Sequence, residues 1–131
     1  MLRAIAPALL LGLLAVPAAL FAEQCVAGVY AMAPWSRSIG GNAFNMAGNA
    51  AKLGFRVDQT PENGALIVYP PSYGRRINAT YGHVALLVDV RPDANGQILI
   101  KDSNGICGGN RRQCRVRMPL WKIVFVIHPK K

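Results

Sequence analysis

One stretch of the chain constrains the fold more than any other, because it carries the pattern of a β-hairpin. Residues 83–90 are a largely apolar run that begins with a histidine, and residues 97–103 supply a returning strand. Between them, residues 93–96 read Asp-Ala-Asn-Gly, a composition that favours a tight turn. The chain is therefore expected to fold back here into two antiparallel strands.

This hairpin predicts a polar contact for its histidine. If the strands pair around the turn, His83 lies opposite a residue between about 102 and 106. Asp102 and Asn104 are two positions apart and so face the same side of a sheet, within reach of the imidazole. The pattern does not choose between these two partners. A polar strand end beside an ordinary satisfied histidine is the alternative interpretation.

Two helices are expected before the hairpin. Residues 24–32 read as a helix that Pro34 interrupts. Residues 42–54 carry apolar and small residues at helical spacing, with Asn42 as a possible cap and Gly54 at the end. The apolar face of the second helix should pack on the sheet that follows.

Strands dominate the second half of the chain. A continuous apolar run predicts a buried strand at residues 65–69, and an alternating pattern predicts a short edge strand at 115–118. A last strand is expected over residues 121–128, with His128 at its exposed end. The expected fold class is therefore α+β, with N-terminal helices packed on a mostly antiparallel β-sheet.

Cys25 opens the first predicted helix and is the best candidate for a nucleophile. A thiol attacks as the thiolate, and helix N-terminal amides together with a nearby imidazole lower its pKa. Of the two histidines, His83 has the context of a site, with a glycine before it and an apolar strand after it. A buried, unreactive cysteine is the simpler alternative.

Four short motifs carry a family resemblance, and they occur in one order along the chain. They are Gln24-Cys25, Gly41-Asn42-Ala43, Gly82-His83-Val84-Ala85 and Asp102-Ser103-Asn104. Together they resemble the CHAP domain, the cysteine- and histidine-dependent amidohydrolase/peptidase family, from about residue 24 to about residue 104. The resemblance implies a papain-like arrangement. Asp102 stands where glutamate is more usual, and Met46 where tryptophan is common.

The resemblance also implies a reaction and the residues that perform it. Cys25 would be the nucleophile, His83 the base, and Asp102 or Asn104 the group that orients the imidazole. The substrate class would be the amide bonds of peptidoglycan, cut without a metal or other cofactor. Candidates for the oxyanion site and the substrate groove are the backbone amide of Cys25 and the side chains of Gln24, Trp35 and Tyr73.

The N-terminus reads as a secretory signal. Residues 1–22 contain one basic residue, an apolar run and small residues before a polar break. Cleavage would leave residues 23–131 as one CHAP-like catalytic domain, periplasmic or secreted. A retained membrane anchor is the alternative, although Pro7 and Pro17 favour cleavage over a stable span.

The charge balance suggests an anionic partner. Lys and Arg number 15 against 6 Asp and Glu, so the net charge is +9, and loss of Arg3 with the signal leaves +8. Peptidoglycan and other anionic envelope polymers fit this charge, whereas nucleic acid lacks a recognition motif here. The expected protein is a monomer. A non-catalytic cationic protein that binds the cell wall is the main alternative function.

The spacing of the three cysteines separates them. Cys107 and Cys114 bracket a glycine-rich loop and are expected to form a disulfide, which leaves Cys25 as the free thiol. Closing so short a loop contributes roughly 2–3 kcal/mol. A thiol redox protein is a weaker alternative because there is no Cys-x-x-Cys motif, and no recognisable metal-ligand spacing is present.

Overall fold

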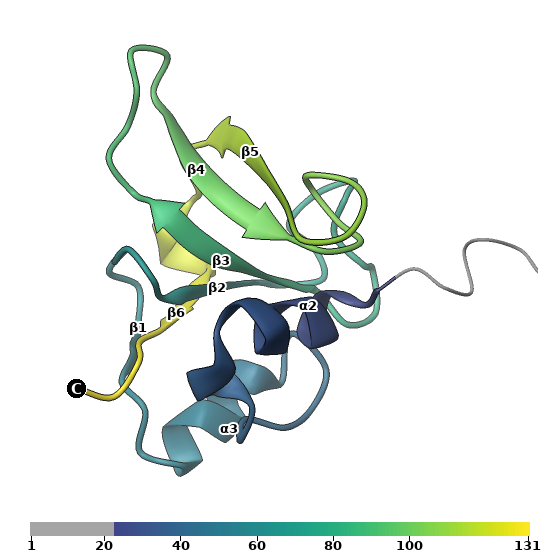
Figure 1. Ribbon diagram of the computed structural model, residues 1–131, viewed down its shortest axis with the longest axis vertical. Coiled ribbons are helices and arrows are strands. Elements are labelled where there is room, and N and C mark those ends of the chain that lie inside the picture. The colour runs from purple at the N-terminus through teal and green to yellow at the C-terminus, as the bar shows by residue number, and fades with distance from the viewer. Residues whose placement is uncertain (1–22) are drawn as a thin grey trace, which may run out of the picture.

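The computed structural model describes residues 23–131, and the predicted signal segment 1–22 lies outside the described residues. This part of the chain folds into helices and one six-stranded sheet of order β1-β6-β2-β3-β4-β5 (Figure 1). Every pairing between neighbouring strands is antiparallel, so the α+β prediction is confirmed. No helix within the described range is long and apolar enough to cross a bilayer. The elements are α2 (Cys25–Met32), α3 (Met46–Lys52), β1 (Val57–Asp58), β2 (Leu66–Tyr69), β3 (His83–Asp89), β4 (Gln97–Asp102), β5 (Arg112–Arg117) and β6 (Phe125–Ile127), with 3-10 turns η3 (Pro34–Ser36) and η4 (Trp121–Ile123).

Apolar side chains cover both faces of the sheet, because successive residues of a strand point to opposite faces. The cluster toward α2 and α3 includes Val29, Met46, Leu66, Val68, Val84 and Ile127. The cluster on the opposite face includes Ile67, Ala85, Leu87, Ile98, Ile100 and Val126. Strand β2 is buried along its whole length, which explains its continuous apolar run. Each fully buried aliphatic side chain contributes roughly 1.5–3 kcal/mol.

The predicted hairpin is present with the expected register. Leu86 lies opposite Lys101 and Leu87 opposite Ile100, and a bulge follows toward the turn. The carboxylate of Asp93 holds the turn by accepting hydrogen bonds from the backbone N–H groups of residues 95 and 97, each at 2.9 Å. The same register, extended in the other direction, brings the start of β3 beside the end of β4.

Helix α3 begins four residues later than the sequence predicts. The side chain of Asn42 accepts a hydrogen bond from the backbone of Asn45 at 3.2 Å, which closes a turn ahead of the helix instead of capping it. The helix ends as expected, because Gly54 adopts a φ of +87° and the N–H of Phe55 reaches back to the carbonyl of Ala50 at 3.0 Å. This is the hydrogen-bond pattern of a glycine-terminated helix.

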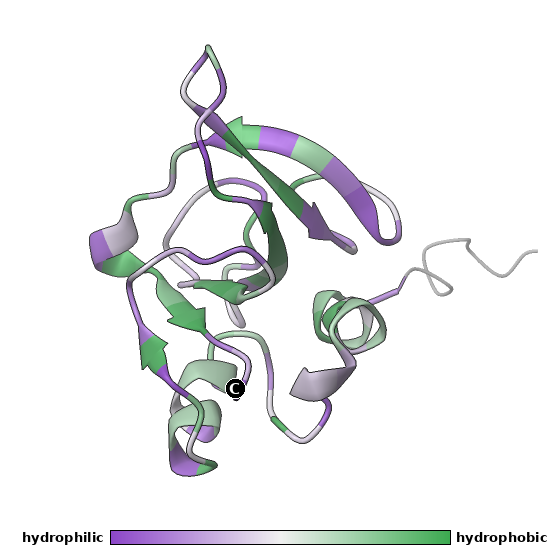
Figure 2. Cartoon of the chain, turned by 60° about the vertical axis from the view of Figure 1, so that its left-hand side comes forward, coloured by the Kyte–Doolittle hydropathy of each residue, from purple (hydrophilic) through white to green (hydrophobic). Residues whose placement is uncertain are grey.

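Strand β5 is the edge strand that the alternating arginines predict, although it begins earlier, at Arg112. Hydrophilic and hydrophobic residues alternate along it in Figure 2. Arg115 and Arg117 are exposed, whereas Cys114 and Val116 are partly buried against the second apolar cluster. Charged side chains on an edge strand oppose pairing with another chain.

The C-terminal segment differs from its prediction. Residues 121–123 form the turn η4 and only Phe125–Ile127 form a strand, which is inserted between β1 and β2. His128, expected at an exposed strand end, is instead only 2 % exposed. Its N–H donates to the carbonyl of Arg56 at 3.0 Å, and β1 covers it. The prediction was wrong because β1 is two residues long and has no pattern of its own in the sequence.

Candidate active site

Cys25 is the first residue of α2, directly after Gln24 in extended conformation. Burial would raise the pKa of its thiol, and the backbone N–H groups of Val84, in β3, and Val26, in the first turn of the helix, are among the groups that lower it. Among residues 23–131 it is the one cysteine outside a disulfide, as predicted. The start of the helix therefore presents a free, partly buried thiol to the start of β3.

His83 is the first residue of β3 and is 2 % exposed. Its Nε2 lies 2.7 Å from Oδ2 of Asp102, and its ring also hydrogen-bonds the thiol of Cys25. The preceding Gly82 has a φ of +71°, and a Cβ there would collide with the carbonyl of Tyr69. A glycine is thus required at the point where the chain turns into the strand that carries the histidine.

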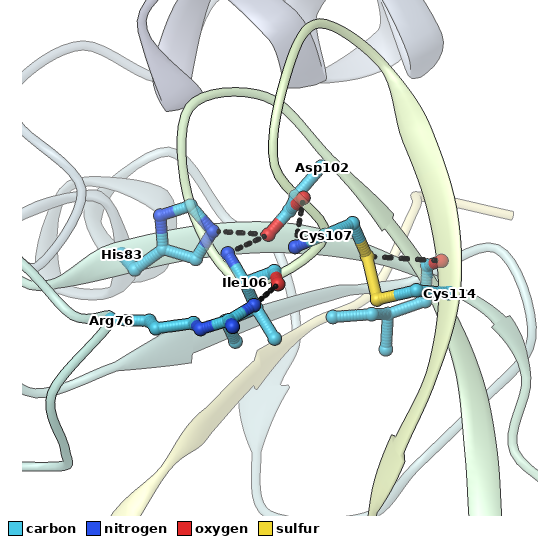
Figure 3. Close-up of a disulfide and its surroundings, with 7 residues drawn as sticks. Arg76, His83, Asp102, Ile106, Cys107 and Cys114 are labelled. Atoms are coloured by element: carbon cyan, nitrogen blue, oxygen red, sulfur yellow. Dashed lines mark hydrogen bonds and ion pairs between the residues drawn. A yellow bond between two sulfur atoms is a disulfide. The ribbon is translucent and has the colours of Figure 1, made fainter.

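Asp102 ends β4 and is completely buried. Besides the imidazole, its carboxylate accepts hydrogen bonds from the backbone N–H groups of Ile106 at 2.9 Å and Cys107 at 3.1 Å (Figure 3). Three donors satisfy a buried carboxylate and fix its orientation. The acid is therefore held in place by its own strand and by the loop that follows.

The pKa shifts of the pair favour its charged form. Burial would raise the pKa of the Cys25 thiol, but the hydrogen bond and charge of His83 outweigh burial and bring that pKa below its ordinary value. Burial would lower the pKa of His83, but hydrogen bonds with Asp102 and Cys25 raise it to about 9. Both shifts stabilise a thiolate beside an imidazolium, as a cysteine nucleophile requires.

The loop between β4 and β5 packs closely against these residues. A Cβ at Gly105 would collide with the His83 ring, so the backbone of this loop lies directly against the imidazole. The predicted disulfide between Cys107 and Cys114 closes the same loop, with a Cα–Cα distance of 5.4 Å. Figure 3 shows the disulfide beside the buried carboxylate. The bridge therefore restrains the backbone that donates to Asp102.

The same loop also ties down the start of α2. Arg111 pairs with the carboxylate of Glu23, with Nη2 at 2.8 Å from Oε1, and the buried Ser103 hydroxyl donates to Glu23 Oε2 at 2.7 Å. Hydrogen bonds from Arg111, then Ser103, hold the pKa of Glu23 below its ordinary value. The residue two positions before Cys25 is thereby fixed to the loop that supports Asp102.

The thiol and the imidazole open on a cleft of about 280 Å³. Its lining includes Gln24, Cys25, Arg76, Asn78, Tyr81, His83 and Asn104. A larger groove of about 930 Å³ lies between α3, β1 and Phe125, away from the thiol. The smaller cleft is the better candidate, because it brings a free thiol and an imidazole together. No group of three or more His, Cys, Asp or Glu side chains within residues 23–131 is arranged to hold a metal ion.

The remaining predicted site residues lie at different distances from this cleft. Asn104 is at its rim, 3.5 Å from the side chain of Gln24, and the carboxylate that contacts His83 is that of Asp102. Trp35 lies outside the cleft and packs on Phe55, with ring centroids 5.8 Å apart. Tyr73 also lies outside it; its ring packs edge-on against a neighbouring tyrosine and its hydroxyl accepts a hydrogen bond from the backbone of residue 120.

Sequence reasoning missed the residues that support the site from behind. Gly105 follows Asp102-Ser103-Asn104 directly, and a glycine after such a polar run was a usable signal for close backbone approach. Glu23 and Arg111 had no such signal, because 88 positions separate them in the sequence. Only the folded chain brings them together.

Comparisons with known proteins give one family match and two similar proteins. The sequence profile of the CHAP domain matches residues 17–104. A protein of Streptococcus mutans described as a putative hydrolase is 33 % identical over 76 residues, which cover 58 % of this chain and 33 % of that protein. The crystal structure of N-acetylmuramoyl-L-alanine amidase from Staphylococcus aureus superposes with a TM-score of 0.61 at 25 % identity, covering 82 % of this chain and 30 % of that one. The chain thus spans about a third of the length of each protein.

Proposed function

The chain belongs to the CHAP domain family, and on that premise we propose that it is an exported cysteine amidase or endopeptidase that hydrolyses amide bonds in peptidoglycan. The observation that carries the proposal is the contact series from the thiol of Cys25 through the imidazole of His83 to the carboxylate of Asp102. The similarity to a cell-wall amidase supports peptidoglycan as the substrate.

In the first half of the reaction, the Cys25 thiolate attacks the amide carbonyl carbon and forms a tetrahedral oxyanion. The backbone N–H of Cys25, at the helix start, and the side chain of Gln24 would donate to that oxygen. Collapse breaks the C–N bond as the His83 imidazolium gives its proton to the leaving amine. The products of this step are a free amine and a thioester on Cys25.

In the second half, the neutral imidazole takes a proton from water, and the resulting hydroxide attacks the thioester carbonyl. Collapse breaks the C–S bond, releases the carboxylic acid and restores the thiolate–imidazolium pair. Asp102 keeps Nε2 occupied throughout, so the other ring nitrogen faces the thiol and the reacting atoms. Asn104 would hold the side chain of Gln24 at the rim of the cleft, because its Nδ2 donates to Gln24 Oε1.

Export is part of the proposal. The apolar run and small residues of segment 1–22 support a cleaved signal, with Glu23 as the first residue of the mature protein. A disulfide at Cys107–Cys114 fits an oxidising compartment outside the cytoplasm. The expected location is the periplasm or the medium, and intact mass of the protein from the envelope fraction tests the cleavage site.

The decisive experiment is digestion of purified sacculi by the mature protein and by Cys25→Ala. Mass spectrometry of the released fragments identifies the bond, because cleavage of the sugar–peptide amide and cleavage within the peptides leave different termini. We expect soluble fragments from wild type and none from the variant. Equal digestion by both proteins would leave the thiol without a role and reject the enzyme assignment.

A cationic wall-binding protein is the second candidate, favoured by the net charge and by the exposed arginines of β5. Such a protein would co-sediment with sacculi without releasing fragments. Its binding would weaken as salt rises and would not depend on Cys25.

A further inference from the structure

The cleft at Cys25 and His83 has an uneven charge. Among the side chains that line the cleft, the thiolate and imidazolium charges cancel and one guanidinium is left, while the Asp102 carboxylate is buried behind the imidazole and does not face the cleft. Within the described residues, no carboxylate lines the cleft. The other polar side chains are the hydroxyl of Tyr81 and four amides, which belong to Gln24, Asn42, Asn78 and Asn104. A cleft of this composition favours an anionic ligand that also accepts and donates hydrogen bonds.

The guanidinium belongs to Arg76, and the loop between β4 and β5 holds it by one hydrogen bond. Nη1 donates to the carbonyl of Ile106 at 2.7 Å, and the N–H of the same Ile106 donates to Asp102. Figure 3 shows the Arg76 and His83 side chains directed toward this loop. A guanidinium has five N–H donors, and one of them makes the bond to Ile106. The charge is thus anchored beside the reacting groups with donors left over.

Four other arginines of the described residues are neutralised by carboxylates, whereas Arg76 is not. Arg56, Arg91, Arg111 and Arg115 each pair with a carboxylate. Within residues 23–131, Arg76 forms no ion pair with an acidic side chain, and its hydrogen bond goes to a backbone carbonyl. An unneutralised guanidinium in a cleft is available to a ligand.

We propose that Arg76 binds a free carboxylate of the substrate, next to the amide that is cut. The inference rests on the proposed function, because the stem peptides of peptidoglycan carry free carboxylates, some of which occur as carboxamides in amidated walls. A guanidinium holds a carboxylate by two parallel N–H···O bonds and gains less from a neutral carboxamide. The enzyme therefore distinguishes the acid form of the wall from its amidated form.

A matched pair of synthetic muropeptides tests this, identical except that one carries a free glutamate α-carboxylate and the other the carboxamide. Wild type should cut the acid form with the higher kcat/KM. In Arg76→Gln the kcat/KM for the acid form should fall roughly 10- to 100-fold, the range of a charge-assisted bond pair. The fall for the amidated substrate should be much smaller, so the ratio of the two kcat/KM values should drop toward one.

The neighbouring Arg75 supplies the control. It is exposed and does not line the cleft, so Arg75→Gln makes the same change in net charge and should leave both substrates unaffected. Arg76→Lys, which keeps a point charge, should recover part of the preference. An equal fall on both substrates in Arg76→Gln would mean that Arg76 only supports the Ile106 loop and would overturn the proposal.

Binding to Cys25→Ala separates this inference from the proposed function. Calorimetry with the same two muropeptides should show tighter binding of the acid form, and Arg76→Gln in that background should remove the difference. If wild type cuts neither substrate but this binding preference is present, the hydrolase assignment fails while the carboxylate site remains. Equal binding of the two forms would reject the carboxylate site.

Discussion

The two histidines of this chain have nearly the same hydrogen-bonded surroundings, yet only one of them faces a free thiol. Both are 2 % exposed. Both place Nε2 against an aspartate oxygen, at 2.7 Å between His83 and Asp102 and at 2.6 Å between His128 and Asp58. The difference is at the other side of the ring. His83 meets the Cys25 thiol there, whereas Nδ1 of His128 meets other charged side chains.

His128 is enclosed in an ion-pair network. Nη2 of Arg56 lies 2.8 Å from its Nδ1, and Oε2 of Glu62 lies 3.3 Å from the same nitrogen. Asp58 in β1 completes the group and pairs with Arg56 as well. The network joins β1, the segment after it and the end of β6, which are otherwise held by two short strand pairings. The buried His128 and its carboxylate partners thus tie segments of the chain together, whereas the pair of His83 and Asp102 lies beside a thiol and a cleft.

The largest expected effect is on activity, when each of the two histidines is replaced in turn. His83→Gln should lower kcat/KM on peptidoglycan by roughly 10³-fold or more, as Cys25→Ala should, because both belong to one catalytic unit. The double variant should be no worse than either single variant. His128→Gln should keep wild-type activity at temperatures where it is folded. Steady-state assays on sacculi make the comparison.

Stability, unlike activity, should fall when either histidine is replaced, because both rings are buried and paired with an aspartate. His128→Gln breaks the network at a buried position and should lower the free energy of unfolding by about 1–3 kcal/mol. Urea denaturation of both variants measures this. A loss of activity in His128→Gln that persists well below its midpoint would contradict the division between the two histidines.

Replacing each aspartate should affect the same property as replacing its partner histidine, but less strongly. Asp102→Asn keeps the shape of the side chain but removes the charge that orients and stabilises the imidazolium, so kcat should fall by roughly 10²- to 10⁴-fold. Asp58→Asn should leave kcat unchanged and lower stability. Asn104→Ala, measured beside them, tests the other predicted partner of His83; a loss as large as that of Asp102→Asn would reopen that choice.

The loop from residue 103 to 111 packs against His83 and not against His128. Changes in this loop should lower kcat by less than Asp102→Asn does. In Gly105→Ala the added methyl would collide with the imidazole, so the ring must shift and kcat should fall by roughly 10- to 10²-fold. Gly48→Ala is the matched control, because a Cβ there meets no neighbouring atom and the site is exposed. Equal activities of the two variants would show that the loop does not position the ring.

Reduction of the disulfide acts on the same loop without changing a residue of the cleft. Opening the Cys107–Cys114 bridge should lower the free energy of unfolding by roughly 2–3 kcal/mol. It should also lower kcat, because the N–H of Cys107 donates to Asp102. The network at His128 has no link to this loop, so its contribution to stability should be the same in the oxidised and reduced protein. Unfolding curves of wild type and His128→Gln in both redox states test this.

The sequence predicted one of the two histidine sites because local pattern determines that site. The Asp-Ala-Asn-Gly turn sets the register that brings His83 within reach of Asp102 and Asn104, and this needs no knowledge of distant contacts. The position of Cys25 beside that pair came from family resemblance, since no local rule places α2 against the start of β3. His128 was misassigned because its partners, Asp58 and Glu62, lie about 70 positions away.

Aromatic residues marked a second limit of sequence reasoning. Trp35 and Tyr73 occur in loops whose composition suits a groove, but both rings pack on other aromatic rings instead. A large ring gains more from burial than from exposure at a rim, and sequence does not reveal which apolar surface is near. Arg76, three residues after Tyr73, does line the cleft, together with Asn78 and Tyr81 of the same loop.

The pH dependence should be the subtlest difference between the two histidines. The pKa of His83 is raised from 6.5 to about 9, so its contribution to stability is complete below about pH 6.5 and is lost as pH rises through 9. Activity should fall over the same alkaline range as the imidazolium deprotonates, and at acid pH as the thiolate, whose pKa is lowered, becomes protonated. For Asp58, burial would raise the pKa but the hydrogen bond from His128 and nearby charges lower it below 3.8, so its contribution is present above that pH and lost as pH falls further. His83→Gln should therefore remove the alkaline fall in unfolding free energy and keep the acid one, while Asp58→Asn should do the reverse.

Iodoacetamide should alkylate Cys25 at pH 6 a few-fold faster than a model thiol, an advantage that His83→Gln abolishes and His128→Gln keeps. Alkylation of wild type at the rate of the model thiol would show that the imidazole does not activate Cys25. His83 would then differ from His128 only in lying near the thiol, and not in any effect on its reactivity.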